Sequence, residues 1–146
     1  MKIVIQRVKE ASVSVNHMII GKIEQGMLIF VGFTENDDLE NVKKMAIKIS
    51  MLRIFSDANN KMNLNIKDFK GRILSVSQFT LYADTEKGNR PSFINSLEKA
   101  KAESLYQAFN KELELILGIK TETGCFGASM EVSLINDGPV TIILEN

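Results

Sequence analysis

Two short segments combine residue types that could recognise or transform a substrate. The first, SQFTL at residues 77–81, places three polar side chains and a bulky Phe directly after an apolar run. The second, NDGPVT at residues 136–141, holds a Gly-Pro pair between two apolar runs. Glycine allows close backbone approach and proline donates no N–H, so this segment would present bare carbonyl oxygens to a ligand. A polar strand end and an ordinary turn are the simpler interpretations.

A hydrolase that uses a side-chain nucleophile also needs a base, and this sequence offers few. His17 is the only histidine and Cys125 the only cysteine. We expect His17 to be an exposed turn residue. A Cys125–His17 dyad is conceivable, but a lone cysteine is more often a small buried apolar side chain. The single Cys and His exclude an intrachain disulfide, a Cys-based zinc cluster and a His-rich metal site. Motifs of serine hydrolases, zinc proteases and phosphate-binding loops are absent.

The chain before SQFTL is predicted to form strands and one helix. Apolar and polar residues alternate over residues 2–8 and 11–15, and Asn16-His17 suits the tip of a hairpin with residues 18–20. Residues 27–33 form an apolar run typical of a buried strand. Apolar spacings of three and four predict an amphipathic helix over residues 39–52. A short strand at 53–55 and a loop at 57–65 follow.

SQFTL itself follows a predicted strand, residues 72–77, and precedes a polar loop at 83–91. A helical pattern covers residues 92–117, with a possible break near Ala102 and Gly118 as the C-cap. Strands at 120–123, 130–135 and 140–144 complete the chain, with a turn at 136–139. This order predicts a single α/β domain over residues 1–146, with a mixed or mostly antiparallel sheet and flanking helices.

Composition and charge exclude several classes of protein. The chain has 146 residues, of which 45% are hydrophobic and 25% charged, as expected for a globular domain. Eighteen Lys and Arg balance 18 Asp and Glu, which excludes a polybasic protein that binds nucleic acid by neutralising many phosphates. No apolar stretch approaches the length of a membrane span, and the N-terminus does not resemble a signal peptide. We therefore expect a cytoplasmic protein.

Together the two segments resemble the signature motifs of the D-aminoacyl-tRNA deacylase family, which are SQFTL and NxGPVT. Both motifs match at every specified position. The resemblance extends over the whole chain, through MKxVxQRV at the N-terminus, GNRPSF at residues 88–93 and TGCFGASM at residues 123–130. Each motif alone could arise by chance, but both in this order are a specific signal.

The resemblance implies a barrel-like homodimer that hydrolyses the ester between a D-amino acid and the terminal adenosine of tRNA. It also implies activity on mischarged glycyl-tRNA, with no cofactor or metal. By the same resemblance, Ser77, Gln78, Phe79 and Thr80 line the pocket for the aminoacyl ester, and backbone N–H groups near Phe79 and Thr80 are candidate oxyanion donors. Phe126 and Met130 match the wall that faces the adenine and the substrate.

The resemblance further implies that Gly138 and Pro139 form a cis element that reaches into the active site of the partner subunit, where their carbonyls exclude an L side chain. Arg7 is expected to brace this element. The sequence alone does not establish the cis state of the bond. A relative with a trans bond that accepts small L-amino acids, and a non-catalytic RNA-binding protein, are the alternatives.

Such a scheme would explain the shortage of catalytic side chains. The 2′-hydroxyl beside the ester can assist the attack, so the protein need not supply a base. Thr80 as a covalent nucleophile is the alternative, although nothing in the sequence would deprotonate it. Several basic residues could meet acceptor-stem phosphates or be ordinary solvated side chains: Lys43, Lys44, Lys48, Lys87 and Arg90.

Overall fold

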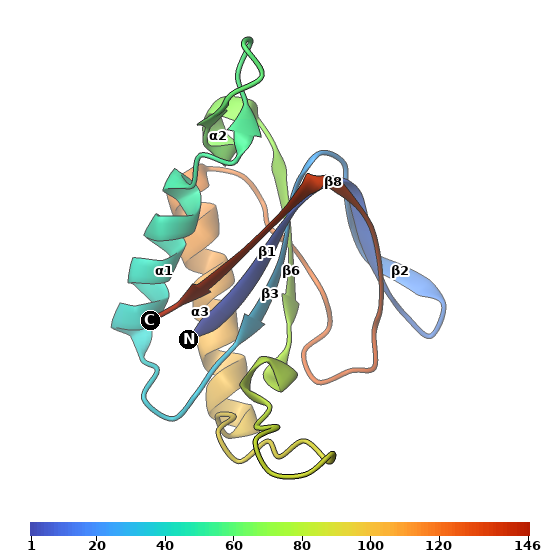
Figure 1. Cartoon of the computed structure of the whole chain (residues 1–146), viewed down its shortest axis with the longest axis vertical. Coiled ribbons are helices and arrows are strands. Elements are labelled where there is room, and N and C mark those ends of the chain that lie inside the picture. Colours follow the sequence, from blue (N-terminus) through green and yellow to red (C-terminus); the bar gives the residue numbers. More distant parts are fainter.

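A computed structural model, which describes all residues 1–146, shows a curled mixed sheet with helices packed on one face (Figure 1). The elements in chain order are β1 (Lys2–Val15), β2 (Met18–Ile23), β3 (Gly26–Gly32), α1 (Leu39–Met51), β4 (Phe55–Ser56), β5 (Met62–Leu64), α2 (Ile66–Phe69), β6 (Arg72–Ser77), the 3-10 helix η1 (Phe79–Tyr82), α3 (Lys99–Leu117), β7 (Glu122–Thr123) and β8 (Glu131–Glu145). This architecture confirms the predicted α/β class with a mixed, barrel-like sheet and flanking helices.

The main sheet has the strand order β2-β1-β3-β6-β7, and β8 pairs with the remaining edge of β1. The strands β2, β3 and β8 run antiparallel to β1, whereas β3, β6 and β7 are parallel to one another. Because β1 is long, β3 pairs with its first half and β2 with its second half. The curl of this strand brings the first part of β8 over the face opposite the helices (Figure 1).

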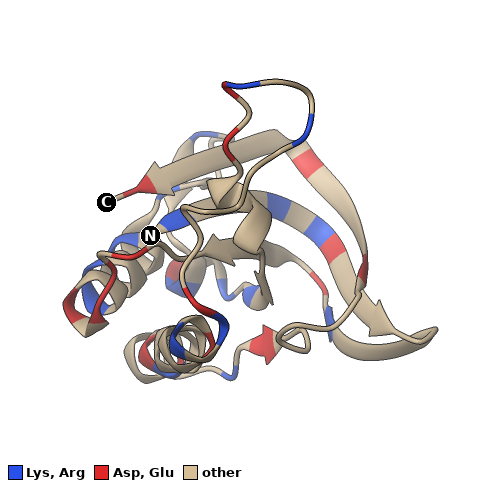
Figure 2. Ribbon diagram, turned by 90° about the horizontal axis from the view of Figure 1, so that it is seen from below, with Lys and Arg blue, Asp and Glu red and all other residues tan.

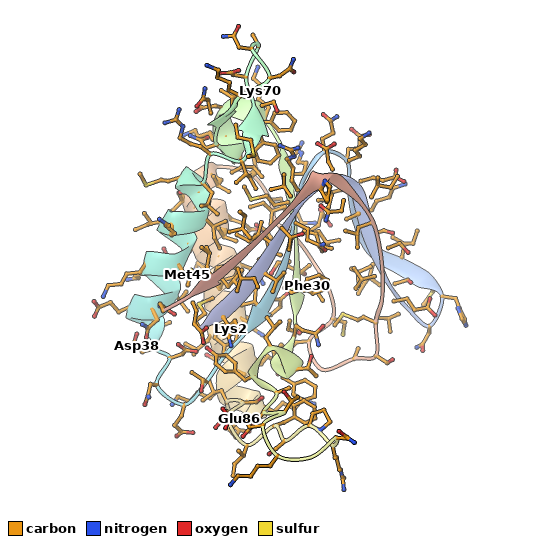
Figure 3. The ribbon with its side chains drawn as sticks, in the orientation of Figure 1. Lys2, Phe30, Asp38, Met45, Lys70 and Glu86 are labelled. Atoms are coloured by element: carbon orange, nitrogen blue, oxygen red, sulfur yellow. The ribbon has the colours of Figure 1, made fainter.

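Two clusters of buried side chains stabilise the sheet from its two faces. The larger lies between the sheet and helices α1 and α3 and includes Met45 and Phe109. The smaller lies inside the curl and includes Val13, Leu74 and Val76, with Phe30 packed against it. Figure 3 shows Met45 and Phe30 on opposite sides of the sheet. No helix in the structure is long and apolar enough to cross a membrane.

The strands are more continuous than the sequence predicts. The two strands predicted at residues 2–8 and 11–15 form one strand, β1, which keeps its pairing with β8 across two register shifts. The predicted turn at residues 136–139 is wrong, because the chain does not reverse there. Instead, residues on both sides pair with β1, and 137–140 form a bulge within β8.

The second long helix is shorter than predicted. Helix α3 begins at Lys99 instead of residue 92 and has no break at Ala102. The preceding residues make other contacts, since Ser92 pairs with Asp84 and the Leu97 N–H donates to the Phe33 carbonyl. The predicted loop at 57–65 also contains a short strand, β5, which pairs with β4.

Candidate active site

The SQFTL segment lies where β6 ends and the chain turns into η1. Its position is fixed by the neighbouring strand, because the Gln78 N–H donates to the Val31 carbonyl at 2.7 Å. The Ser96 hydroxyl donates to the Phe79 carbonyl at 3.1 Å. Phe79 is 57% exposed, and its ring meets that of Phe93 edge-on, with 5.0 Å between ring centroids. The segment is therefore held at the surface, beside the end of the parallel strands.

A cavity of about 470 Å³ opens beside this segment. Its volume falls within the usual range of small-ligand sites, about 300–1,000 Å³. The lining is mostly apolar and comes from β3, β6, η1, the start of α3 with the residues before it, and the chain that leads into β8. The lining residues are Val31, Gly32, Phe33, Val76, Ser77, Gln78, Phe79, Ser96, Leu97, Lys99, Ala102, Phe126, Gly127, Ala128, Met130 and Val132. The structure thus gathers Ser77, Gln78, Phe79, Phe126 and Met130 around one cavity.

An aromatic contact from α3 supports one wall of the cavity. The Tyr106 ring lies 5.8 Å from the Phe126 ring, centroid to centroid. The Tyr106 hydroxyl donates to the Ser75 carbonyl at 2.7 Å, which ties α3 to the strand that ends at Ser77. Burial raises the pKa of the Tyr106 phenol. This tyrosine is therefore a neutral hydrogen-bond donor that positions the cavity wall.

Thr80 is not among the lining residues and is exposed. Its hydroxyl oxygen accepts a hydrogen bond from the Gln78 side-chain amide at 2.5 Å. Helix η1 begins at Phe79, and no side chain caps its first N–H groups. The first N–H groups of a helix have no partner within the helix. The backbone N–H groups of Phe79 and Thr80 therefore have no partner within η1, and of these two residues only Phe79 lines the cavity.

The Gly-Pro pair forms part of the bulge in β8. The Gly138–Pro139 peptide bond is cis, and both residues are exposed. Arg7 lies opposite on β1, with its side chain only 12% exposed. Its guanidinium donates to the Ile54 carbonyl at 2.7 Å and to the Asp137 carbonyl at 3.3 Å, and it lies 3.1 Å from the Asp137 carboxylate. Arg7 therefore connects the bulge to the loop that follows α1.

Neither Arg7, Gly138 nor Pro139 lines the cavity of its own chain. Arg7 pairs with Met27 on β3, which in turn pairs with Ile73 at the start of β6. The cavity lies at the other end of these strands, beside Val31 and Ser77, which are partners in the same register. Met27 and Val31 are four residues apart on β3. At a rise of about 3.3 Å per residue, the row of Arg7 and the row of the cavity are about 13 Å apart along the strands.

The remaining candidates do not line the cavity. His17 is at the β1–β2 turn with its side chain 91% exposed, as predicted. Its Nδ1 lies 4.0 Å from the Glu131 carboxylate. The expectation that Cys125 is buried is wrong, because its segment leaves it exposed between Gly124 and Phe126. No three His, Cys, Asp or Glu side chains converge as a metal-binding group. Basic and acidic residues are interspersed over the ribbon, including the loop that carries Lys87 (Figure 2).

Sequence reasoning missed several residues of the cavity. Ser96 and Leu97 line it from just before α3, and Lys99 lines it as the first residue of α3. The predicted helix had placed all three inside a regular helical pattern. Glu98 could have indicated the true start, because an acidic side chain can cap a helix. Its carboxylate accepts from the N–H groups of Ala100 and Lys101, and these hydrogen bonds lower the pKa of Glu98.

Comparison with known proteins gives consistent matches along the chain. Residues 4–145 match the family model described as D-Tyr-tRNA(Tyr) deacylase. A D-aminoacyl-tRNA deacylase of Lactobacillus gasseri is 53% identical over 145 residues, 99% of each chain. One from Flavobacterium psychrophilum is also 53% identical, over 100% of this chain and 97% of its own.

Two solved structures have the same fold. A protein described as c-Myc DNA Unwinding Element Binding Protein superposes with a TM-score of 0.94 at 38% identity, covering 100% of this chain and 99% of its own. A probable eukaryotic D-amino acid tRNA deacylase superposes with a TM-score of 0.87 at 16% identity, covering 98% and 97%, which is a likeness of fold alone.

Proposed function

Since the chain belongs to the D-Tyr-tRNA(Tyr) deacylase family, we propose how its own residues hydrolyse D-aminoacyl-tRNA. The reaction splits the ester between a D-amino acid and tRNA. The observation that carries the proposal is the cavity at the end of β6, because the SQFTL residues Ser77, Gln78 and Phe79 line it together with Phe126 and Met130. This cavity receives the terminal adenosine and places the ester carbonyl at its mouth.

Hydrolysis proceeds by attack of water on the ester carbonyl carbon. The negative charge that develops on the carbonyl oxygen is stabilised by the backbone N–H groups of Phe79 and Thr80. The bond from the carbonyl carbon to the ribose oxygen then breaks, and the proton lost by water is transferred to that oxygen through the neighbouring ribose hydroxyl. The cavity lining contains no His, Asp or Glu, which fits a reaction in which the substrate assists its own hydrolysis.

The selection for D-amino acids requires a second copy of the chain. Arg7, which holds the bulge with Gly138 and Pro139, lies about 13 Å along the strands from the cavity of its own chain, by the register and rise of β3 and β6. Gly138 and Pro139 therefore act on the cavity of a partner subunit in a homodimer. The free edge of β8 supports such an interface, because Ile135 and Ile143 flank the bulge and are 49% and 66% exposed.

In the dimer, the carbonyl groups of this element lie against the α-carbon of the substrate. An L side chain would meet these carbonyls, whereas a D side chain points away from them. Glycine has no side chain to reject, so glycyl-tRNA is also a substrate. Because 18 Lys and Arg are balanced by 18 Asp and Glu, the protein binds the acceptor end and not the body of the tRNA. Its substrate places it in the cytoplasm.

Thr80→Ala is expected to keep its single-turnover rate on D-tyrosyl-tRNA within about threefold of the wild type. The Thr80 hydroxyl lies outside the cavity lining and accepts a hydrogen bond from Gln78, with no base beside it. The measurement is release of D-tyrosine under enzyme excess. The control is Thr80→Ser, which keeps a hydroxyl. A loss of about 10³-fold in Thr80→Ala that Thr80→Ser restores would identify Thr80 as a covalent nucleophile and contradict the proposal.

A further inference from the structure

We infer that Lys99 binds the phosphodiester that joins the terminal adenosine of the substrate to the preceding nucleotide. This inference rests on the proposed function and adds to it a contact for the sugar-phosphate backbone. Lys99 is the only charged residue in the lining of the cavity, whose other members are apolar or neutral. It lies at the start of α3, and its side chain is exposed at the cavity wall.

The positive charge of Lys99 is not neutralised within the chain. No carboxylate lies within 4.0 Å of its ammonium group, and the adjacent Glu98 carboxylate is occupied by the N–H groups of Ala100 and Lys101. A cation at the first residue of a helix is also unfavourable, because that end carries a partial positive charge. The structure of α3 therefore gives no reason for a lysine at this position.

The segment that faces Lys99 has a glycine, Gly127, which leaves room for the ammonium group at the cavity wall. A Cβ at Gly127 would be 3.0 Å from Lys99 Cε and 3.1 Å from Nζ. Gly127 also has φ +74°, a backbone conformation that side chains other than glycine rarely adopt. The lysine thus crosses the bare backbone between Phe126 and Ala128, both of which line the cavity.

A phosphodiester is the anion that fits this place. When the nucleoside occupies the apolar cavity, its ribose lies toward the mouth and its 5′-phosphate lies at the rim. Every aminoacyl-tRNA carries this phosphate next to its terminal adenosine, so one unpaired cation at the rim serves all substrates equally. A carboxylate on a D-aspartyl group is the other anion that could reach the ammonium group, and the test separates the two.

The test compares Lys99→Met with Lys99→Arg and with Lys101→Met, a control on the same helix that does not line the cavity. With D-tyrosyl-tRNA, Lys99→Met should lower kcat/KM by about five- to tenfold, mainly through KM, and reduce the slope of log(kcat/KM) against log[salt] by about 0.7. Lys99→Arg should restore both values. Lys101→Met should resemble the wild type.

Two further measurements assign the effect to the phosphate. The ester 3′-O-(D-tyrosyl)adenosine has no phosphate, so its hydrolysis should be equal in Lys99→Met and the wild type. Adenosine 5′-monophosphate should inhibit the wild type more strongly than adenosine does, and Lys99→Met should remove that difference. An equal loss on both esters, an unchanged preference for the monophosphate, or a loss confined to D-aspartyl-tRNA would overturn the inference. A wild-type chain inactive on both esters would overturn the proposed function itself.

Discussion

Gly138→Ala is expected to lower kcat/KM on D-tyrosyl-tRNA by at least about 100-fold, because misplacing substrate-positioning atoms by about 1 Å has effects of this size. Gly138 has φ +119°, a conformation that an L side chain rarely adopts. Its added Cβ would lie 2.8 Å from Arg7 Nη2 and 3.0 Å from Val140 Cγ2. Since Arg7 is held by the Ile54 carbonyl, the bulge itself must move.

The same substitution should weaken the rejection of L-tyrosyl-tRNA, so the ratio of the D rate to the L rate falls. Both rates are measured under single turnover, and thermal unfolding reports whether the variant is folded. The matched control is Gly118→Ala, because Gly118 also has a positive φ, +68°, but a Cβ there would meet nothing within 4 Å. Full activity and full L-rejection in a folded Gly138→Ala chain would contradict the role of this element.

Mixing two inactive variants tests whether Gly138 acts across a dimer. Ala128→Trp blocks the cavity, since Ala128 lines it, while leaving β8 intact. A mixture with Gly138→Ala forms heterodimers in which one site combines an open cavity with an intact Gly138–Pro139 element. Random pairing should restore about one quarter of wild-type activity. If Gly138 served its own chain, no activity would return.

A substrate with a terminal 2′-deoxyadenosine is expected to react about 10²–10³-fold more slowly than its ribose counterpart when the ester is fixed on the 3′ oxygen. The reason is that no side chain in the cavity can replace the missing hydroxyl as a base. Lys99 is the one titratable residue of the lining, and His17 is exposed at the β1–β2 turn and does not line the cavity.

The deoxy substrate is compared under single turnover, after subtracting the spontaneous hydrolysis of each ester. Competition against the ribose substrate shows whether the deoxy end still binds. Equal rates on the two substrates would mean that the protein supplies the base, and the substrate-assisted mechanism would be wrong.

Local patterns in the sequence predicted most of the elements but not how they join. The alternation in residues 2–8 and 11–15 correctly indicates strands, but β1 is continuous because β8 pairs with it on both sides of Lys9. The Gly138–Pro139 segment has the composition of a turn, but β8 pairs with β1 on both sides of it. Local composition cannot distinguish a reversal from a bulge that long-range pairing holds open.

The site was predicted in part. The motif residues Ser77, Gln78 and Phe79 lie together with Phe126 and Met130. These last two are far from the motif in the sequence and were predicted only from the family resemblance. Thr80 was expected to line the pocket with them, yet it is not among the lining residues, and its hydroxyl accepts a hydrogen bond from Gln78. Lys99 was missed because the helical pattern extended past the true start of α3, where Glu98 forms the cap.

The most direct test of the account is the hydrolysis of D-tyrosyl-tRNA and L-tyrosyl-tRNA by the purified chain, with and without a chelator. We expect release of D-tyrosine to be at least about 100-fold faster than release of L-tyrosine, since the carbonyls of the Gly138–Pro139 element reject the L side chain. The chelator should change neither rate. Equal hydrolysis of the two enantiomers, or tight tRNA binding without hydrolysis, would contradict the account.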